Sequence, residues 1–178
     1  MNRRVWIKQT LIAGGGLLII PACLQDAGAV SVLLKNIKIT AKEESLFAEL
    51  TEAILPQTNT LGAKSLNLHQ FVLKMFDDCY SEEDQKKLVS GLRKLNNFSE
   101  KNLNEGFTRL PEDTKLEVLN SISAGKAADD NLKFFLAETK NWVIKGYNTC
   151  EYFSNKIIPY ELVPGRFHGC VTINNSAR

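Results

Sequence analysis

Between residues 41 and 147, apolar side chains recur every three or four positions, which is the spacing of amphipathic helices. Five such stretches cover about 41–55, 67–79, 81–106, 111–125 and 130–145. One alternating run, 35–40, could form a short strand, but a single strand buries nothing. The pattern therefore predicts an all-α protein: a compact bundle of about five amphipathic helices with short connections.

The apolar periodicity also predicts which side chains face the core of this bundle. They are Leu46, Phe47, Leu50, Ile54, Leu55, Leu68, Phe71, Val72, Met75, Phe76, Cys79, Leu88, Val89, Leu92, Leu95, Phe98, Leu116, Val118, Leu119, Ile122, Leu132, Phe135, Leu136, Trp142 and Val143. Cys79 lies on the apolar stripe of its helix, so we expect a small buried hydrophobe there. Asp77 and Asp78 are expected to form a solvated helix end.

Helix boundaries follow from the residues that cap them. Thr40 and Glu43 have the capping-box spacing, in which each side chain binds a backbone N–H of the other. Asn67 and Gln70 offer the same reciprocal arrangement to the second helix. The third helix either breaks near Asn96 or continues unevenly toward Gly106. Gly146 predicts the end of the fifth helix, because glycine is favoured just after a helix.

The first 22 residues have the pattern of an export signal, a charged start followed by an apolar run from 11 to 20. Arg3 and Arg4 stand side by side before that run and resemble the twin-arginine signal. The four residues ending at Cys23 resemble a lipobox, in which Cys23 would be lipidated and become the first residue of the mature chain. The run is shorter than the ~20 residues of a membrane span. We therefore expect export to the periplasm and a lipid anchor to a membrane.

Two further segments flank the helical domain. Residues 23–40 are predicted to be a tether that leads from the leader to the domain at 41–147. Prolines and glycines in residues 148–178 exclude a continuous helix. That segment is nevertheless rich in Ile, Tyr, Leu, Val and Phe, unlike a disordered tail. An extended tail of this kind is expected to lie on its own domain or on another subunit.

Charge and cysteine content narrow the classes of function. The 178 residues carry a formal charge of +2, but the leader holds three of the basic residues, which leaves 19 basic and 20 acidic residues after it. That balance does not favour nucleic acid, which calls for a basic face. The four cysteines are Cys23, Cys79, Cys150 and Cys170. If Cys23 carries lipid, three remain, so at least one is unpaired or bonds to another chain.

No catalytic motif is found. The sequence lacks G-x-S-x-G, H-E-x-x-H, the phosphate-binding G-x-x-x-x-G-K-[ST], and a G-x-G-x-x-G after a strand. It also lacks a Cys/His cluster, and its two histidines make a zinc site improbable. We therefore assign no catalytic, cofactor or metal residue to this chain.

A series of short motifs resembles one known family. They are A-I-L-P at 53–56, T-x-G-A at 60–63, Ser81-Glu82-Glu83, Gly91-Leu92, Leu110-Pro111, Gly146-Tyr147 and P-G-R-F-x-G-C at 164–170. Their order, together with the twin-arginine leader, is similar to the small subunit of gluconate 2-dehydrogenase, subunit 3. The resemblance extends over roughly 46–171.

The resemblance implies a non-catalytic subunit. Its partner would be a larger FAD-dependent dehydrogenase of the glucose-methanol-choline type, accompanied through twin-arginine export and stabilised by this chain. The FAD would belong to the partner, which oxidises a sugar or glycoside and passes electrons to a cytochrome c or a similar acceptor. An open alternative is a free-standing helical envelope lipoprotein that serves as a binding or scaffold module. The third hypothesis is that this chain is an enzyme that is active by itself.

The C-terminal tail is where we expect the partner interface. Its residues are Pro164, Gly165, Arg166, Phe167, Gly169 and Cys170. Cys170 would form a disulfide either with the partner, which we favour, or with Cys150 of the same chain.

Overall fold

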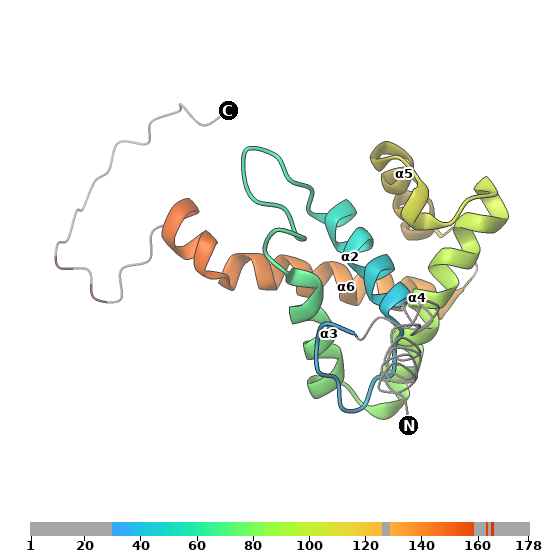
Figure 1. The fold of residues 1–178 in the computed structure, drawn as a ribbon, viewed down its shortest axis with the longest axis horizontal. Helices are drawn as coiled ribbons and strands as arrows, with labels where there is room; N and C mark the ends of the chain where they lie inside the picture. Colours follow the sequence, from blue (N-terminus) through green and yellow to red (C-terminus); the bar gives the residue numbers. More distant parts are fainter. Residues whose placement is uncertain (1–29, 126–128, 159–162, 164, 166–178) are drawn as a thin grey trace, which may run out of the picture.

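The computed structural model describes residues 30–125, 129–158, 163 and 165 (Figure 1). Its elements are α2 (Ala41–Ile54), α3 (Leu68–Cys79), α4 (Glu82–Leu103), a 3-10 turn η3 (Phe107–Arg109), α5 (Glu112–Ser123), α6 (Asp130–Thr149) and a π-helical turn η4 (Phe153–Ile157). The part of the chain that the structure describes thus has five α-helices and no strand. The predicted all-α fold is confirmed.

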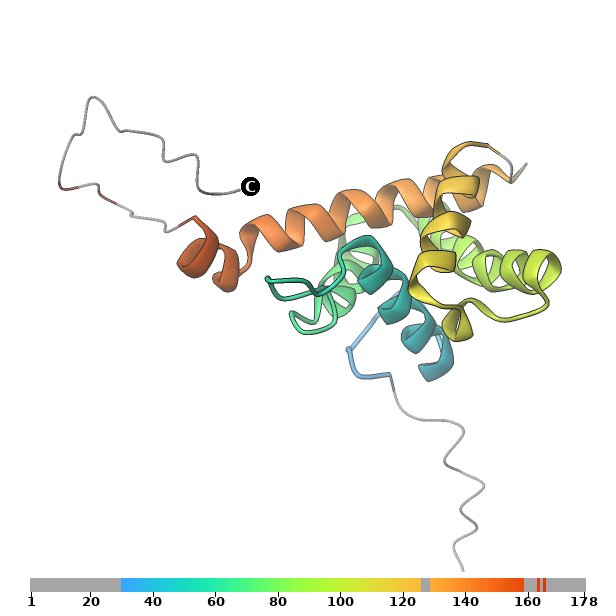
Figure 2. The same cartoon turned by 90° about the horizontal axis from the view of Figure 1, so that it is seen from above.

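Helix α6 organises the bundle. It contacts α2, α3, α4 and α5 (Figures 1 and 2). The rings of Phe47, Phe76 and Phe135 meet in the core, where the Phe47 centroid lies 6.1 Å from that of Phe76 and 5.9 Å from that of Phe135. All three side chains are fully buried, so α2, α3 and α6 share one apolar centre.

Two glycines let α6 approach its neighbours closely. A Cβ atom on Gly91 of α4 would lie 2.3 Å from the Cβ of Phe135 on α6. A Cβ atom on Gly146 of α6 would lie 2.8 Å from the ring of Phe71 on α3. The prediction that Gly146 ends the fifth helix is wrong, because α6 continues to Thr149 and uses this glycine for packing.

The caps are partly as predicted. The Glu43 N–H donates to the Thr40 hydroxyl at 3.2 Å, and the Thr40 N–H donates to the Glu43 carboxylate at 2.7 Å, so the capping box is formed. The reciprocal cap at Asn67 is not formed, since Asn67 is left-handed (φ 52°) and makes no side-chain cap. The Gln70 amide instead donates to the Ser31 hydroxyl at 2.8 Å. Helix α4 continues unbroken to Leu103.

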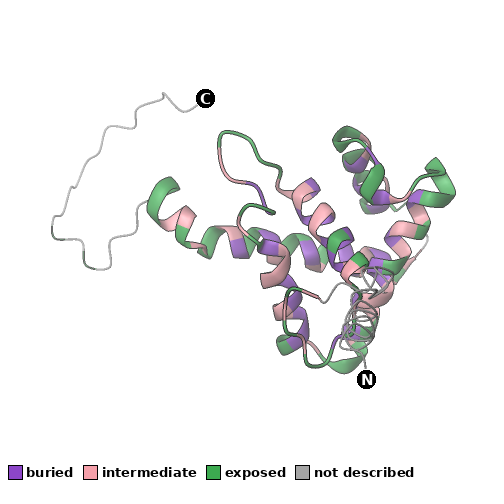
Figure 3. Cartoon of the chain, viewed as in Figure 1, coloured by how far each residue is buried: buried purple, intermediate pink, exposed green. Residues whose placement is uncertain are grey.

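Most predicted core positions are buried or half-buried, but three predictions about α3 and α5 are wrong. Cys79 is exposed, Leu116 is 44% exposed, and Asp77 is only 1% exposed. The buried face of α3 consists of Leu68, Val72, Leu73, Phe76 and Asp77. That face is rotated from the predicted stripe because a segment before α2 also packs on α3. Figure 3 shows buried residues on the inner sides of the helices.

Candidate functional site

The described residues contain no group of three or more His, Cys, Asp and Glu side chains that could hold a metal ion. Within the same residues no helix combines the length and apolarity of a membrane span. The features that stand out are two surfaces at the ends of the domain.

The first surface is the end of α6 together with η4, residues 147–158, which we call the C-terminal projection. Figure 2 shows it extending beyond the other helices of the bundle. None of the η4 residues is buried. Ile157 is 38% exposed and Ile158 is 62% exposed, and Val163 beyond them is 75% exposed. Exposed apolar side chains gathered at one end are typical of a protein interface.

The C-terminal projection is nevertheless an ordered turn. The rings of Tyr147 and Phe153 pack edge to face with their centroids 5.3 Å apart. The N–H of Ser154 donates to the carbonyl of Cys150 at 3.2 Å, and the N–H of Ile158 donates to that of Phe153 at 2.9 Å. The side chains therefore have a defined support from which to contact a partner, which lowers the entropy cost of binding.

The predicted interface residues lie mostly beyond what the structure describes. Gly165 is described and exposed. The predicted site residues outside the described part are Arg3, Arg4, Cys23, Pro164, Arg166, Phe167, Gly169 and Cys170. Cys150 is half-buried at the base of the C-terminal projection. Its pairing with Cys170 stays a prediction.

The second surface involves residues 31–40, which we call the strap; it runs from Ser31 into the cap of α2. The carboxylate of Asp77 accepts the backbone N–H groups of Lys35 (2.7 Å), Asn36 (2.7 Å) and Ile37 (2.8 Å). Ile37 itself is only 6% exposed. This part of the predicted tether is packed onto the domain, and Asp77 is a buried anchor rather than a solvated helix end.

The strap has further bonds on both sides of this anchor. Near its start, the N–H of Ser31 donates to the Glu44 carboxylate at 2.8 Å. The side-chain amides of Asn36 and Gln85 donate to the Asp77 carbonyl at 2.9 and 2.8 Å. The strap, α3 and α4 are thereby joined at one point.

The protonation state of Asp77 follows from these contacts. Burial would raise its pKa, but the backbone N–H donors and the nearby Lys74 ammonium lower it more, so the net effect is a pKa below the usual value. The side chain is therefore a carboxylate at neutral pH, and its hydrogen bonds to the strap are charge-assisted.

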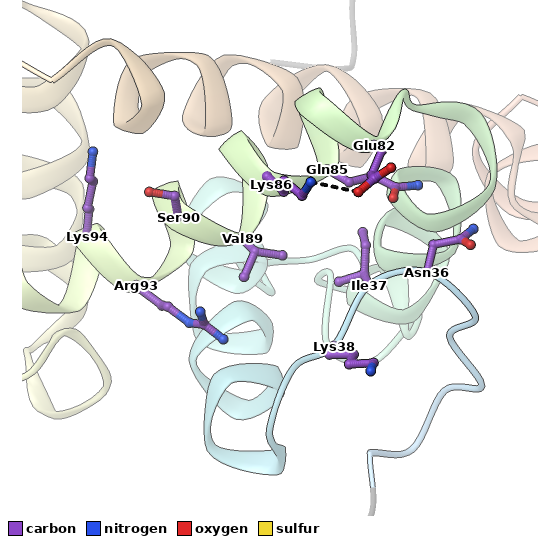
Figure 4. A pocket seen from close by; sticks show the side chains of 10 residues that line it. All are labelled: Asn36, Ile37, Lys38, Glu82, Gln85, Lys86, Val89, Ser90, Arg93 and Lys94. Carbon is purple, nitrogen blue, oxygen red and sulfur yellow. Dashed lines mark hydrogen bonds and ion pairs between the residues drawn. The ribbon is translucent and has the colours of Figure 1, made fainter.

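A groove of about 580 Å³ lies between the strap and α4 (Figure 4). Its lining residues are Asn36, Ile37, Lys38, Glu82, Gln85, Lys86, Val89, Ser90, Arg93 and Lys94. The strap supplies one side and α4 the other, as Figure 4 shows. Sequence reasoning missed this groove, because it depends on where the strap packs.

Tyr80 bridges α3 and α6 at another edge of the core. Its hydroxyl donates to the Glu138 carboxylate and accepts from the Trp142 indole N–H at 2.7 Å. Burial first, and then the Glu138 carboxylate, raise the pKa of Tyr80 to about 12. The phenol therefore stays protonated at neutral pH and acts as a structural bridge.

The described part of the chain is thus an all-α bundle with exposed apolar side chains at one end. The chain belongs to the gluconate 2-dehydrogenase subunit 3 family, whose sequence model matches residues 41–165. No curated protein and no solved structure matches the chain. The family resemblance is thus confirmed. A family of this description is an accessory part of a multi-subunit dehydrogenase, which implies a separate catalytic partner. The match begins at the first residue of α2, after the strap, and includes the C-terminal projection.

Proposed function

We propose that this chain is the non-catalytic small subunit of an FAD-dependent sugar or glycoside dehydrogenase of the glucose-methanol-choline type. It escorts the folded catalytic subunit through twin-arginine export by means of Arg3 and Arg4, and it stabilises that subunit. Lipidation of Cys23 anchors the complex to a membrane in the periplasm. The FAD lies in the partner, and a cytochrome c accepts the electrons.

The observation that carries this proposal is the family match, which extends over the whole helical domain and its C-terminal projection. Two exposed isoleucines at the projection, Ile157 and Ile158, offer apolar area to a partner. Burying such a side chain contributes about 1.5–3 kcal/mol. The predicted interface residues begin at Pro164, six positions after Ile158 in the chain.

Stabilisation of the partner follows from linkage. A subunit that binds only the folded form of its partner raises the partner's apparent stability by mass action. The same preference suits an export route that carries folded proteins, because the escort then binds only cargo that is ready for export.

Co-purification tests the proposal. The full chain, tagged after Arg178, is isolated from the native envelope, and an absorption spectrum is recorded. We expect a larger protein with a flavin spectrum that oxidises a sugar with a dye acceptor. A monomer without flavin would contradict the proposal and favour the free-standing lipoprotein.

Export is tested by replacing Arg3 and Arg4 with lysine. We expect both this chain and the flavoprotein to remain in the cytoplasm. The matched control is Arg109→Lys, at an exposed position in the domain, which should leave export unchanged. Export of the flavoprotein without this chain would contradict the escort role.

Non-reducing electrophoresis of the complex distinguishes the two pairings of Cys170. A bond to the partner predicts one large band that Cys170→Ser separates into two. A bond to Cys150 predicts two bands in either case.

A further inference from the structure

The groove between the strap and α4 is lined by more cationic than acidic side chains. Four of its lining side chains are cationic, Lys38, Lys86, Arg93 and Lys94, and among the lining residues only Glu82 is acidic. The chain without its leader is nearly neutral, with 19 basic and 20 acidic residues. When Glu43 and Asp129, which pair with Arg93 and Lys94 from outside the lining, are counted as well, the groove still has one more cation than carboxylate.

Two of the charges in the groove, those of Lys38 and Lys86, are available to a ligand. Lys86 lies 2.6 Å from Glu82, Arg93 lies 2.6 Å from Glu43, and Lys94 lies 2.6 Å from Asp129. The Lys86–Glu82 pair is exposed on both sides (74% and 83%), and an exposed ion pair of this kind contributes little stability, whereas Glu43 is only 17% exposed and Asp129 35%. An incoming carboxylate can therefore replace Glu82 beside Lys86 at low cost. Lys38 is exposed and has no ion pair with another described residue.

The shape of the groove favours one class of ligand. Its surface is concave, with the apolar Ile37 and Val89 between the cations, whereas a membrane surface is flat. A small-molecule site is usually enclosed and has a few fixed polar groups, but here the cations are long, exposed side chains. An extended peptide segment fits a groove that has an apolar base and flexible charges along it.

We propose that this groove is a docking site for an extended acidic segment of the catalytic subunit. The inference rests on the proposed function, because that function supplies the partner. Figure 1 places the strap and the start of α4 away from the C-terminal end of α6, so the partner is held at two separate points. Two linked contacts bind more tightly than either alone, because the second forms at high effective concentration.

The test uses the full chain in its purified complex, under reducing conditions, with two double variants. Lys38→Glu with Lys86→Glu reverses two charges in the groove. Lys101→Glu with Lys140→Glu makes the same change in net charge at two exposed lysines outside it. The dissociation constant of the complex is measured at two salt concentrations, and the thermal unfolding of each variant is recorded.

We expect the groove variant to raise the Kd at least about tenfold and to weaken its salt dependence, with unfolding unchanged. The control variant should stay within about twofold of the original chain. Equal effects of the two variants, or no effect of either, would overturn the docking site while the complex still supports the proposed function. Unchanged partner binding, with loss of sedimentation on phosphatidylglycerol vesicles, would overturn it in favour of a lipid surface. Absence of any flavoprotein in the original complex would overturn both proposals.

Discussion

The strap and the C-terminal projection flank the same helical domain, but the strap buries its apolar side chain in the domain whereas the C-terminal projection exposes its isoleucines. The strap has its apolar Ile37 only 6% exposed, and the Asp77 carboxylate accepts three of its backbone N–H groups. The C-terminal projection has Ile158 62% exposed and no buried residue in η4.

This difference separates two roles for apolar residues outside the core. The strap belongs to the folded domain, because its polar backbone is satisfied by a buried carboxylate while its apolar side chain fills the core. The C-terminal projection satisfies its backbone by helical bonds and leaves Ile157 and Ile158 exposed. Substitutions that remove the buried contacts of the strap should therefore change folding, whereas those at its exposed side chains should not. Substitutions of the exposed isoleucines in the C-terminal projection should change binding.

The largest expected effect comes from Asp77→Ala. It removes the acceptor of three backbone N–H groups, one of which belongs to buried Ile37. Hydrogen bonds to a charged group contribute about 1.5–3 kcal/mol each and are not additive, so we expect a loss of about 3 kcal/mol in the free energy of unfolding. Urea unfolding measures it.

The neighbouring Asp78→Ala is the control, because Asp78 is exposed and paired only with Lys74 among the described residues. It should cost less than about 0.5 kcal/mol. Limited trypsin digestion should cut Asp77→Ala first at Lys35 or Lys38. Equal stability of the two variants would mean that the strap contributes nothing to folding.

The next effect tests the other surface. Replacing both Ile157 and Ile158 with serine removes apolar area that the partner would cover, and we expect a loss of about 2 kcal/mol, roughly 30-fold in Kd for the catalytic subunit. Unfolding should change by less than about 0.5 kcal/mol, since both side chains are exposed.

Leu33→Ser is the matched control for this pair, because Leu33 is an apolar residue of the strap that is 90% exposed. It should leave both stability and partner binding unchanged. A Kd that stays the same after the isoleucine substitutions would remove the C-terminal projection from the interface.

The helical domain could be predicted from sequence because its signals are local. The capping box at Thr40 and Glu43 lies within one turn, and the apolar spacing of α2 and α4 is regular, so their positions and inner faces were correct within a few residues. The sequence of the third helix left open whether the helix breaks near Asn96 or continues. The packing of α4 on α6 is consistent with an unbroken helix.

The strap could not be predicted because its bonds are not local. Asp77 is 40 residues from Ile37 in sequence, and an aspartate at a helix end is ordinarily solvated. The same limit applies to Gly146. A glycine near the expected end of a helix favours termination, and only the closeness of Phe71 across the interface shows that this glycine serves packing instead. Tertiary contacts, which the local sequence does not reveal, determine the roles of both Asp77 and Gly146.

Gly146→Ala should have a smaller effect at the boundary between the bundle and the C-terminal projection. Its new methyl group would lie 2.8 Å from the Phe71 ring, which must shift. Overpacking costs about 1–3 kcal/mol, and the better helix propensity of alanine offsets up to about 1 kcal/mol, so we expect a net loss of about 1 kcal/mol by thermal unfolding. Lys140→Ala, at an exposed position of the same helix, should be neutral. A stabilised Gly146→Ala would show that α6 is not held closely against α3.

The smallest effect is a pH dependence that belongs to the strap alone. The pKa of Asp77 lies below its usual value of 3.8 in the folded chain, because the backbone N–H donors outweigh the effect of burial. A depressed folded pKa contributes stability that is present above the unfolded value and is lost as the pH falls through the folded one. The difference in unfolding free energy between the original chain and Asp77→Asn should therefore be constant above about pH 5 and shrink below about pH 4. Substitution of both isoleucines in the C-terminal projection should give a pH profile parallel to that of the original chain. A difference for Asp77→Asn that does not change below pH 4 would show that this carboxylate keeps its ordinary pKa, and hence that its hydrogen bonds to the strap are weak.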